Sequence, residues 1–346
     1  QIVELSWENN TWKLLRTRPD KQHLVTTGQA FGNFYTVAEE IFQQMLYPFT
    51  LQDLNNPGYF QMEKPAMYKP VTKLNNFIKL QLMQTFRNCN AVLDLASGKG
   101  QDLFNLHGLG VKNMVFVDID KQALQTIQQR RYKLGKRQYY NFNPQPAKQY
   151  KIWTKQLDLS KPFTENITYM QDIPVKQFNG FLFNFAIHYL INSTAAINNV
   201  IGFIDHYAQK GSRLIITCFD GKRLFDLLKH GNINLPPNDP KFSIKKEYDS
   251  DVFKTGLKIS VIHPFSNREY YTEYLVDLHR IAMEFKKHGY LVVKSGQFTD
   301  FLDEFKQHMP DWYDQLDSAD KTYSGYYNYL ILEKNSQSKK SNTGKK

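Results

Sequence analysis

The chain has 346 residues, and its 44 lysines and arginines outnumber its 33 aspartates and glutamates, which gives a net charge of +11. Such a length can bury a full core, and the basic excess favours a polyanionic partner. Two cysteines exclude a disulfide-stapled fold, no Cys or His spacing is typical of a metal site, and no apolar run reaches the roughly 18 residues of a membrane span. We therefore expect no metal, no membrane and a reducing compartment. Because the chain begins at Gln1, we expect it to be cut from a longer polypeptide.

The first 22 residues predict a hairpin. Ile2–Trp7 has the character of a strand, Asn9 and Asn10 form a turn, and Trp12–Lys21 reads as a second strand with alternating faces. Its basic side chains are Lys13, Arg16, Arg18 and Lys21. Composition alone favours a solvated charged face for this cluster.

Residues 23–65 predict a linker with one amphipathic helix, Thr36–Leu46, between segments rich in Gly, Asn and Pro. A second helix starts near Tyr68, and its apolar stripe is formed by Leu74, Phe77, Ile78, Leu82 and Phe86. Asn75, Asn76 and Lys79 lie off or beside this stripe, and such residues normally form a solvated face.

The central motif is VLDLASGKGQDL at residues 92–103, which predicts a strand, a glycine turn and a helix. Val92–Leu95 has the composition of a short buried strand, residues 96–100 turn the chain, and a helix opens at Gln101. Open α/β sheets hold nucleotide-like ligands on such a turn, because glycine lets the backbone approach the ligand closely.

Two carboxylates indicate which ligand this turn binds. Leu103 stands where a dinucleotide fingerprint has its third glycine, and Asp94 precedes the turn, where it suits a cationic ligand. Asp118 ends the next apolar run, 18 residues after Gly100, where a carboxylate can bind a ribose diol. Together they predict an S-adenosylmethionine site with Gly98 and Gly100 under the cofactor. The alternative is a purely structural turn.

Two later strands carry further candidates. Trp153–Leu159 predicts a third strand, in which Asp158 either meets the adenine amino group or caps a turn at Ser160. Phe178–Leu190 predicts a fourth, whose polar residues are Asn184, His188 and Tyr189. A lone histidine here is more often a hydrogen-bonded core residue, but the carboxyl end of a central strand is also where such sheets bind ligands.

Between these strands, the sequence predicts a helix at Gln122–Arg131 and a basic connection at Tyr132–Lys151. After them, it predicts a helix at Ala195–Ala208, a strand at Arg213–Cys218, an inserted lobe with hairpins at residues 231–270, and a strand or loop at Glu269–Leu278 that carries Glu273. The last predictions are a helix at Leu278–His288 that ends at Gly289, closing strands at Tyr290–Lys294 and Tyr326–Leu332, and a disordered basic tail at residues 335–346.

The motifs NNFIK, VLDLASGKGQDL, FVDID, NFAIHYL and TEYLV occur in this order and resemble those of the mRNA cap guanine-N7 methyltransferases, from about residue 68 to residue 334. Near the N-terminus, W-K-x-x-R-x-R-x-D-K resembles the last motif of the RNA guanylyltransferases, although their Lys-x-Asp-Gly nucleophile motif is absent. The chain thus resembles the C-terminal part of a multifunctional viral capping enzyme of the African swine fever virus type.

This resemblance implies four segments: a guanylyltransferase remnant at 1–22, a linker at 23–65, the methyltransferase domain at 66–334 and a tail at 335–346. The domain would be an α/β, class I (Rossmann-like) fold, with a mostly parallel seven-stranded sheet, helices on both faces and an antiparallel C-terminal strand. The implied partners are capped RNA and the guanylyltransferase and triphosphatase domains of the same polypeptide. The implied location is the cytoplasm, in a viral factory or virion.

The resemblance also assigns roles to residues. Those expected to bind S-adenosylmethionine are Lys79 at the methionine carboxylate, Asp94 at the cationic methionine end, Gly98 beneath the cofactor, Asp118 at the ribose, Asp158 at the adenine, and Asn184. Those expected to bind the cap guanine are Asn75, His188, Tyr189, Glu273 at the N1 and N2 edge, and Tyr327. The sequence departs from the family pattern at Ser97, Asn184 and Phe219, where cysteine, glutamine and proline are common.

The implied chemistry needs no acid or base. Guanine N7 carries a free lone pair that can attack the sulfonium methyl in line, so we expect catalysis by proximity and electrostatics, with S-adenosylhomocysteine as product. Two alternatives stay open. One is a methyltransferase for another RNA base or a metabolite, and the other is a non-catalytic RNA-binding or stimulatory subunit.

Overall fold

The structure is a computed structural model that describes residues 2–8, 11–29, 32, 66–139, 150–263 and 269–335. The helix predicted at Thr36–Leu46, most of the predicted linker and the tail beyond residue 335 lie outside the described residues. The chain forms two compact units, Gln1–Leu51 and Gln52–Lys346. The predicted domain boundary at residue 66 stays a prediction.

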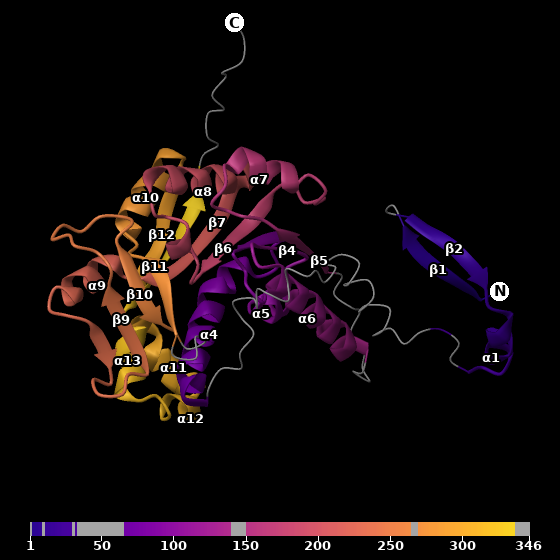
Figure 1. Ribbon diagram of the computed structural model, residues 1–346, viewed down its shortest axis with the longest axis horizontal. Coiled ribbons are helices and arrows are strands. Elements are labelled where there is room, and N and C mark those ends of the chain that lie inside the picture. Colours follow the sequence, from indigo (N-terminus) through magenta and orange to yellow (C-terminus); the bar gives the residue numbers. More distant parts are fainter. Residues whose placement is uncertain are drawn as a thin grey trace, which may run out of the picture. The chain divides into compact units, whose positions relative to one another are not determined.

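The N-terminal unit contains the predicted hairpin. Strand β1 (Val3–Glu8) pairs antiparallel with β2 (Thr11–Thr17), and a 3-10 turn, η1 (Pro19–Lys21), leads into helix α1 (Gln22–Thr26) (Figure 1). The prediction that the second strand reaches Lys21 is wrong. Proline lacks a ladder donor and its fixed φ suits the first turn of a helix, so Pro19 opens η1 instead.

The larger unit is organised on a seven-stranded sheet with the order β12-β13-β7-β6-β3-β4-β5 (Figure 1). Only β13 runs antiparallel to its neighbours, and the other neighbouring pairs are parallel, which confirms the predicted sheet. The strands are β3 (Ala91–Leu95), β4 (Asn113–Asp118), β5 (Lys151–Gln156), β6 (Phe178–Asn184), β7 (Ala208–Phe219), β12 (Tyr290–Gln297) and β13 (Tyr327–Lys334).

Helices cover both faces of this sheet, as predicted. On one face, strand residues such as Leu93 and Phe181 share a core with Ile201 of α8 and Phe285 of α10. On the other face the sheet packs against η3 and α6, and a Cβ on Gly180 would lie 2.5 Å from the Phe86 ring. The helices are α4 (Lys69–Met83), η3 (Gln84–Phe86), α5 (Leu103–Gly108), α6 (Lys121–Tyr139), α7 (Phe163–Tyr169), α8 (Thr194–Tyr207), α9 (Gly221–Leu228) and α10 (Leu278–Lys287).

A second, antiparallel sheet forms the predicted inserted lobe, with the order β11-β10-β9-β8. Its strands are β8 (Ile233–Leu235), β9 (Phe242–Lys246), β10 (Lys258–Ile262) and β11 (Tyr270–Tyr274). Strand β11 carries Glu273, opposite Ile259 of β10. The sequence analysis missed the short helices η5 (Phe298–Phe301), α11 (Leu302–His308), α12 (Pro310–Tyr313) and α13 (Ser318–Ser324).

Three predicted boundaries are wrong. Helix α6 continues into the predicted basic connection as far as Tyr139, because residues 132–139 include several good helix formers and no proline. Strand β6 ends at Asn184 rather than Leu190, since Phe185 takes a left-handed conformation (φ 55°) and leaves the ladder. Strand β5 ends at Gln156 rather than Leu159, before the Asp158–Ser160 turn.

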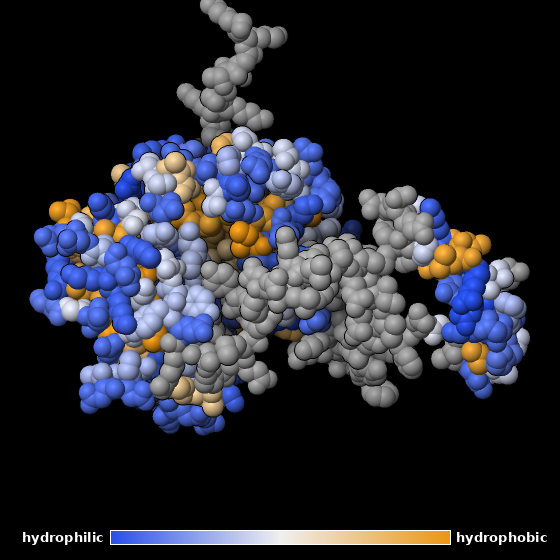
Figure 2. All heavy atoms as spheres, viewed as in Figure 1, coloured by the Kyte–Doolittle hydropathy of each residue, from blue (hydrophilic) through white to orange (hydrophobic). Residues whose placement is uncertain are grey.

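None of the helices within the described residues has the length and apolar content required to cross a bilayer. On the visible face of the larger unit, polar side chains cover much of the surface (Figure 2). On the N-terminal unit, apolar and charged side chains form separate patches (Figure 2), and Val3, Leu5, Leu14 and Leu15 are exposed there.

Candidate functional site

A cavity of about 480 Å³ lies at the carboxyl edge of the parallel strands. The chain passes from β3 to β4 and β5 on one side and then returns to β6 on the other, so the loops after β3 and β6 diverge and leave a crevice. All eleven predicted site residues line this cavity: Asn75, Lys79, Asp94, Gly98, Asp118, Asp158, Asn184, His188, Tyr189, Glu273 and Tyr327. Their individual roles stay predictions.

The glycine turn is held in an unusual backbone conformation. Ala96, Gly98 and Gly100 all have positive φ values, of 52°, 52° and 63°. This conformation costs little for glycine but is strained for Ala96, and such strain clusters at ligand sites. Gly98 lines the cavity, whereas Gly100 does not, and a Cβ on Gly100 would lie 2.7 Å from Ile127 of α6. The absence of a side chain at Gly100 is needed for helix packing, and the expectation that both glycines lie under the cofactor stays a prediction.

Asp118 joins the glycine turn to the end of β4. Its Oδ2 accepts the backbone N–H of Gly98 at 2.7 Å, and its Oδ1 accepts that of Asp120 at 2.8 Å. Burial raises the pKa of Asp118, and these backbone donors oppose the rise. The carboxylate thus fixes the turn that faces the cavity.

Sequence analysis missed Asp102, which connects two of the predicted cofactor residues. Its Oδ1 lies 2.8 Å from Nζ of Lys79, and its Oδ2 accepts a hydrogen bond from Nδ2 of Asn184 at 2.9 Å. Lys79 is 4% exposed, so it does not belong to a solvated face. The sequence feature that could have identified Asp102 is its position within VLDLASGKGQDL, two residues after Gly100.

We expect Asp102→Ala to lower the free energy of unfolding by about 3–5 kcal/mol, because it leaves the buried Lys79 ammonium without its counter-charge. Urea unfolding followed by circular dichroism measures this change. Asp226→Ala is the matched control, since Asp226 pairs with Lys222 and Lys229 on the surface and should cost at most about 1 kcal/mol. Equal losses for both variants would contradict a stabilising role for Asp102.

Asp94 is a buried carboxylate with an excess of acidic neighbours. Burial raises its pKa well above the ordinary value, Asp102 and Asp118 raise it further, and Lys79 opposes them. Additional positive charge in the cavity would therefore favour the ionised form of Asp94. A sulfonium or ammonium group would supply that charge.

Asp158 caps a turn, which was one of its two predicted roles, and its contact with the adenine stays a prediction. Its Oδ1 accepts the backbone N–H of Ser160 at 2.9 Å and also the Ser160 hydroxyl, so it caps the turn after β5. It lines the cavity at the same time.

A fully buried carboxylate, Glu273, lies among histidines. Its Oε1 is 3.1 Å from Nε2 of His188, contacts Nε2 of His263, and receives a long 3.5 Å hydrogen bond from the hydroxyl of Tyr189. Burial would raise the pKa of Glu273, but the two imidazoles outweigh burial and hold it well below its ordinary value. Its Oε2 has no hydrogen-bond partner within the described part of the chain. The sequence analysis missed His263, whose signal was a polar residue ending an apolar strand.

Phe219 does not form the wall of the cavity. It stacks on Tyr327 with ring centroids 4.2 Å apart, and only Tyr327 reaches the cavity. The Tyr327 hydroxyl donates to the Tyr323 hydroxyl at 3.0 Å. The departure from proline at position 219 therefore places a ring behind the predicted cap-contacting tyrosine.

Among the described residues, no group of three His, Cys, Asp or Glu side chains could hold a metal ion. The arrangement offers instead acidic groups suited to a cationic nucleoside and a carboxylate suited to a base edge. Cofactor candidates come from α4 and the ends of β3 to β6, whereas most cap candidates come from the region after β6, β11 and β13.

Known proteins resemble this chain over most of its length. The mRNA (guanine-N(7))-methyltransferase domain profile matches residues 61–319. The mRNA-capping enzyme of African swine fever virus (isolate Tick/South Africa/Pretoriuskop Pr4/1996) is 30% identical over 94% of this chain and 38% of its own length. The probable mRNA-capping enzyme of Acanthamoeba polyphaga mimivirus is 26% identical over 94% of this chain and 32% of its own length.

A solved S-adenosylmethionine-dependent methyltransferase from Clostridium acetobutylicum is 12% identical, with a TM-score of 0.46, over 88% of this chain and 100% of that one. The family assignment depends on the profile, which covers three quarters of the sequence. The chain therefore belongs to the mRNA (guanine-N7)-methyltransferase family, S-adenosylmethionine-dependent enzymes that methylate the guanine cap of mRNA.

Proposed function

We propose that the cavity holds S-adenosylmethionine on its α4, β3, β4 and β5 side and the cap guanine on its β11 and β13 side. The observation that carries this proposal is the shared lining: Asp94 and Asp118 face the same 480 Å³ space as Glu273. Asp94 would balance the cationic methionine end, and Asp118 would bind the ribose. Glu273 would accept from the N1 and N2 edge of guanine, because only guanine among the bases offers both donors there.

The reaction needs little from the protein beyond placement. As the N7–carbon bond forms, the carbon–sulfur bond breaks, so the positive charge passes from the sulfonium to the guanine ring. Holding the two reactants in line supplies on the order of 7–11 kcal/mol in favourable systems. His188, Tyr189 and Asn75 would orient the base, while Lys79, Gly98, Asp158 and Asn184 hold the cofactor. Tyr327 would complete the guanine pocket.

The direct test incubates the protein with labelled S-adenosylmethionine and either GpppA-capped or uncapped RNA. Nuclease digestion and mass spectrometry then identify the methylated nucleoside. N7-methylguanine from capped RNA alone supports the proposal. Label in an internal base would favour a methyltransferase for another RNA base, and absence of transfer would favour a non-catalytic RNA-binding subunit.

We expect cofactor binding to release a proton from Asp94. The raised pKa favours protonation of the empty site, whereas a bound cation favours the ionised carboxylate, so S-adenosylmethionine affinity should rise with pH until Asp94 is ionised in the free protein. Calorimetry between pH 5 and 8, in buffers with different ionisation heats, measures the released proton. Asp94→Asn should remove the release, and an unchanged proton count in this variant would contradict the role of Asp94.

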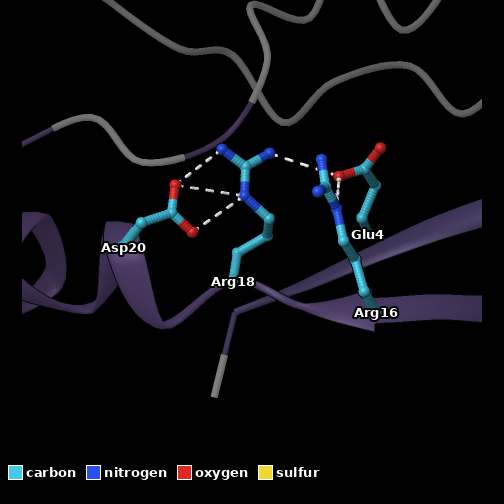
Figure 3. Close-up of polar contacts among 4 residues, drawn as sticks. All are labelled: Glu4, Arg16, Arg18 and Asp20. Carbon is cyan, nitrogen blue, oxygen red and sulfur yellow. Dashed lines mark hydrogen bonds and ion pairs between the residues drawn. The ribbon is translucent and has the colours of Figure 1, made fainter.

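We also propose that this chain acts within a larger capping polypeptide, because it spans about 38% of the length of the African swine fever virus relative. Its N-terminal hairpin resembles the end of a guanylyltransferase. In that unit Arg18 binds both Asp20 and Glu4, and Arg16 binds Glu4 (Figure 3). The guanylyltransferase and triphosphatase domains would be its partners, and the cytoplasm its location. Mass spectrometry of the intact protein from infected cells would test the association.

A further inference from the structure

Two imidazoles share one oxygen of Glu273. His188 comes from the 3-10 turn after β6, and His263 follows β10 in the inserted lobe, yet Nε2 of both faces Oε1. Glu273 is fully buried, and His188 and His263 are 2% and 5% exposed. All three residues also line the cavity, so a ligand bound on this side of the cavity would meet the cluster.

Because both histidines face Oε1 of Glu273, the other carboxylate oxygen, Oε2, is left for a ligand. Nε2 of each imidazole lies next to Oε1, and an imidazole Nε2–H can donate to a carboxylate oxygen. Oε2 of Glu273 then remains as a buried acceptor with no hydrogen-bond partner in the described part of the chain.

We propose that His263 is a positioning residue for guanine recognition: together with His188 it binds Oε1 of Glu273, which presents Oε2 as the acceptor for the guanine edge. This inference rests on the proposed function. It also changes the expected contact between Glu273 and guanine. Because the histidines occupy Oε1, the N1–H and N2–H donors would both bind Oε2, instead of one donor binding each oxygen.

The test compares two substitutions at position 263 by steady-state kinetics with GpppA-capped RNA. His263→Phe keeps a ring but removes the donor to Oε1, so we expect KM for the capped RNA to rise at least about tenfold, while KM for S-adenosylmethionine stays within twofold. His263→Gln keeps an N–H donor that does not titrate. It should recover part of the loss in KM for the capped RNA. His230→Gln, at an exposed turn after α9, should match the wild type.

Calorimetry with free GpppA distinguishes a failure of the role assigned to His263 from a failure of the proposed function. If wild-type protein binds GpppA and Glu273→Gln does not, but His263→Phe binds it with wild-type affinity, the role of His263 is refuted and the proposed function stands. If His263→Phe weakens S-adenosylmethionine as much as GpppA, His263 is merely structural and the inference is also refuted. If wild-type protein fails to bind GpppA, the proposed function itself fails.

Discussion

Replacing Glu273 with alanine is expected to abolish cap methylation while S-adenosylmethionine still binds. The carboxylate is fully buried and its pKa is held low by the two imidazoles, so it is ionised throughout the working range. A hydrogen bond to such a charged group contributes about 1.5–3 kcal/mol, which corresponds to a loss of about 10- to 150-fold in kcat/KM for each bond. Steady-state kinetics with capped RNA measures the loss, and calorimetry measures cofactor binding.

Glu273→Gln separates charge from shape, because it keeps the volume but turns one acceptor into a donor. We expect it to be as inactive as Glu273→Ala, since an amide N–H would face the donors of guanine or of the histidines. Glu247→Ala is the control: Glu247 lies in the same lobe, is exposed, and accepts from the Ser260 hydroxyl. Cap methylation retained by the Glu273 variants would remove Glu273 from the guanine site.

Asp118→Ala is expected to raise the dissociation constant for S-adenosylmethionine about 10- to 150-fold, because it removes one hydrogen bond to a charged group. A further loss should come from the glycine turn, because Oδ2 of Asp118 holds the N–H of Gly98. Calorimetry with the free cofactor measures the change. Since the pKa of Asp118 is raised by burial, the affinity of the wild-type protein should also weaken at acid pH.

The matched control for Asp118 is Asp172→Ala, which removes an acid that pairs with Lys155 at the surface. Asp172 does not line the cavity, so cofactor binding should be unchanged. Asp118→Asn should have an intermediate effect, because its amide oxygen can still accept one hydrogen bond. Wild-type affinity in Asp118→Ala would show that the ribose binds elsewhere in the cavity.

The cofactor side of the site was predictable because its signal is local. Asp94 and Gly98 lie in one strand-turn-helix motif, and Asp118 ends the following strand, so their relative positions follow from the motif. The resemblance of short motifs to a known family added Asn75, Lys79 and the cap residues, and the cavity contains all of them. Local periodicity failed at the boundaries, where Phe185 leaves β6 although the apolar run continues.

The sequence by itself determined the class of fold and the residues that meet at the edge of the sheet, because glycine turns, apolar strands and motif order are properties of contiguous residues. The tertiary structure alone decided which polar groups pair. Asp102 binds Lys79 and Asn184, which are 23 and 82 residues away, and His188 reaches Glu273 of the antiparallel sheet from the turn after β6 of the mostly parallel sheet. These pairings depend on how distant elements pack, and burial then makes each charge require a partner.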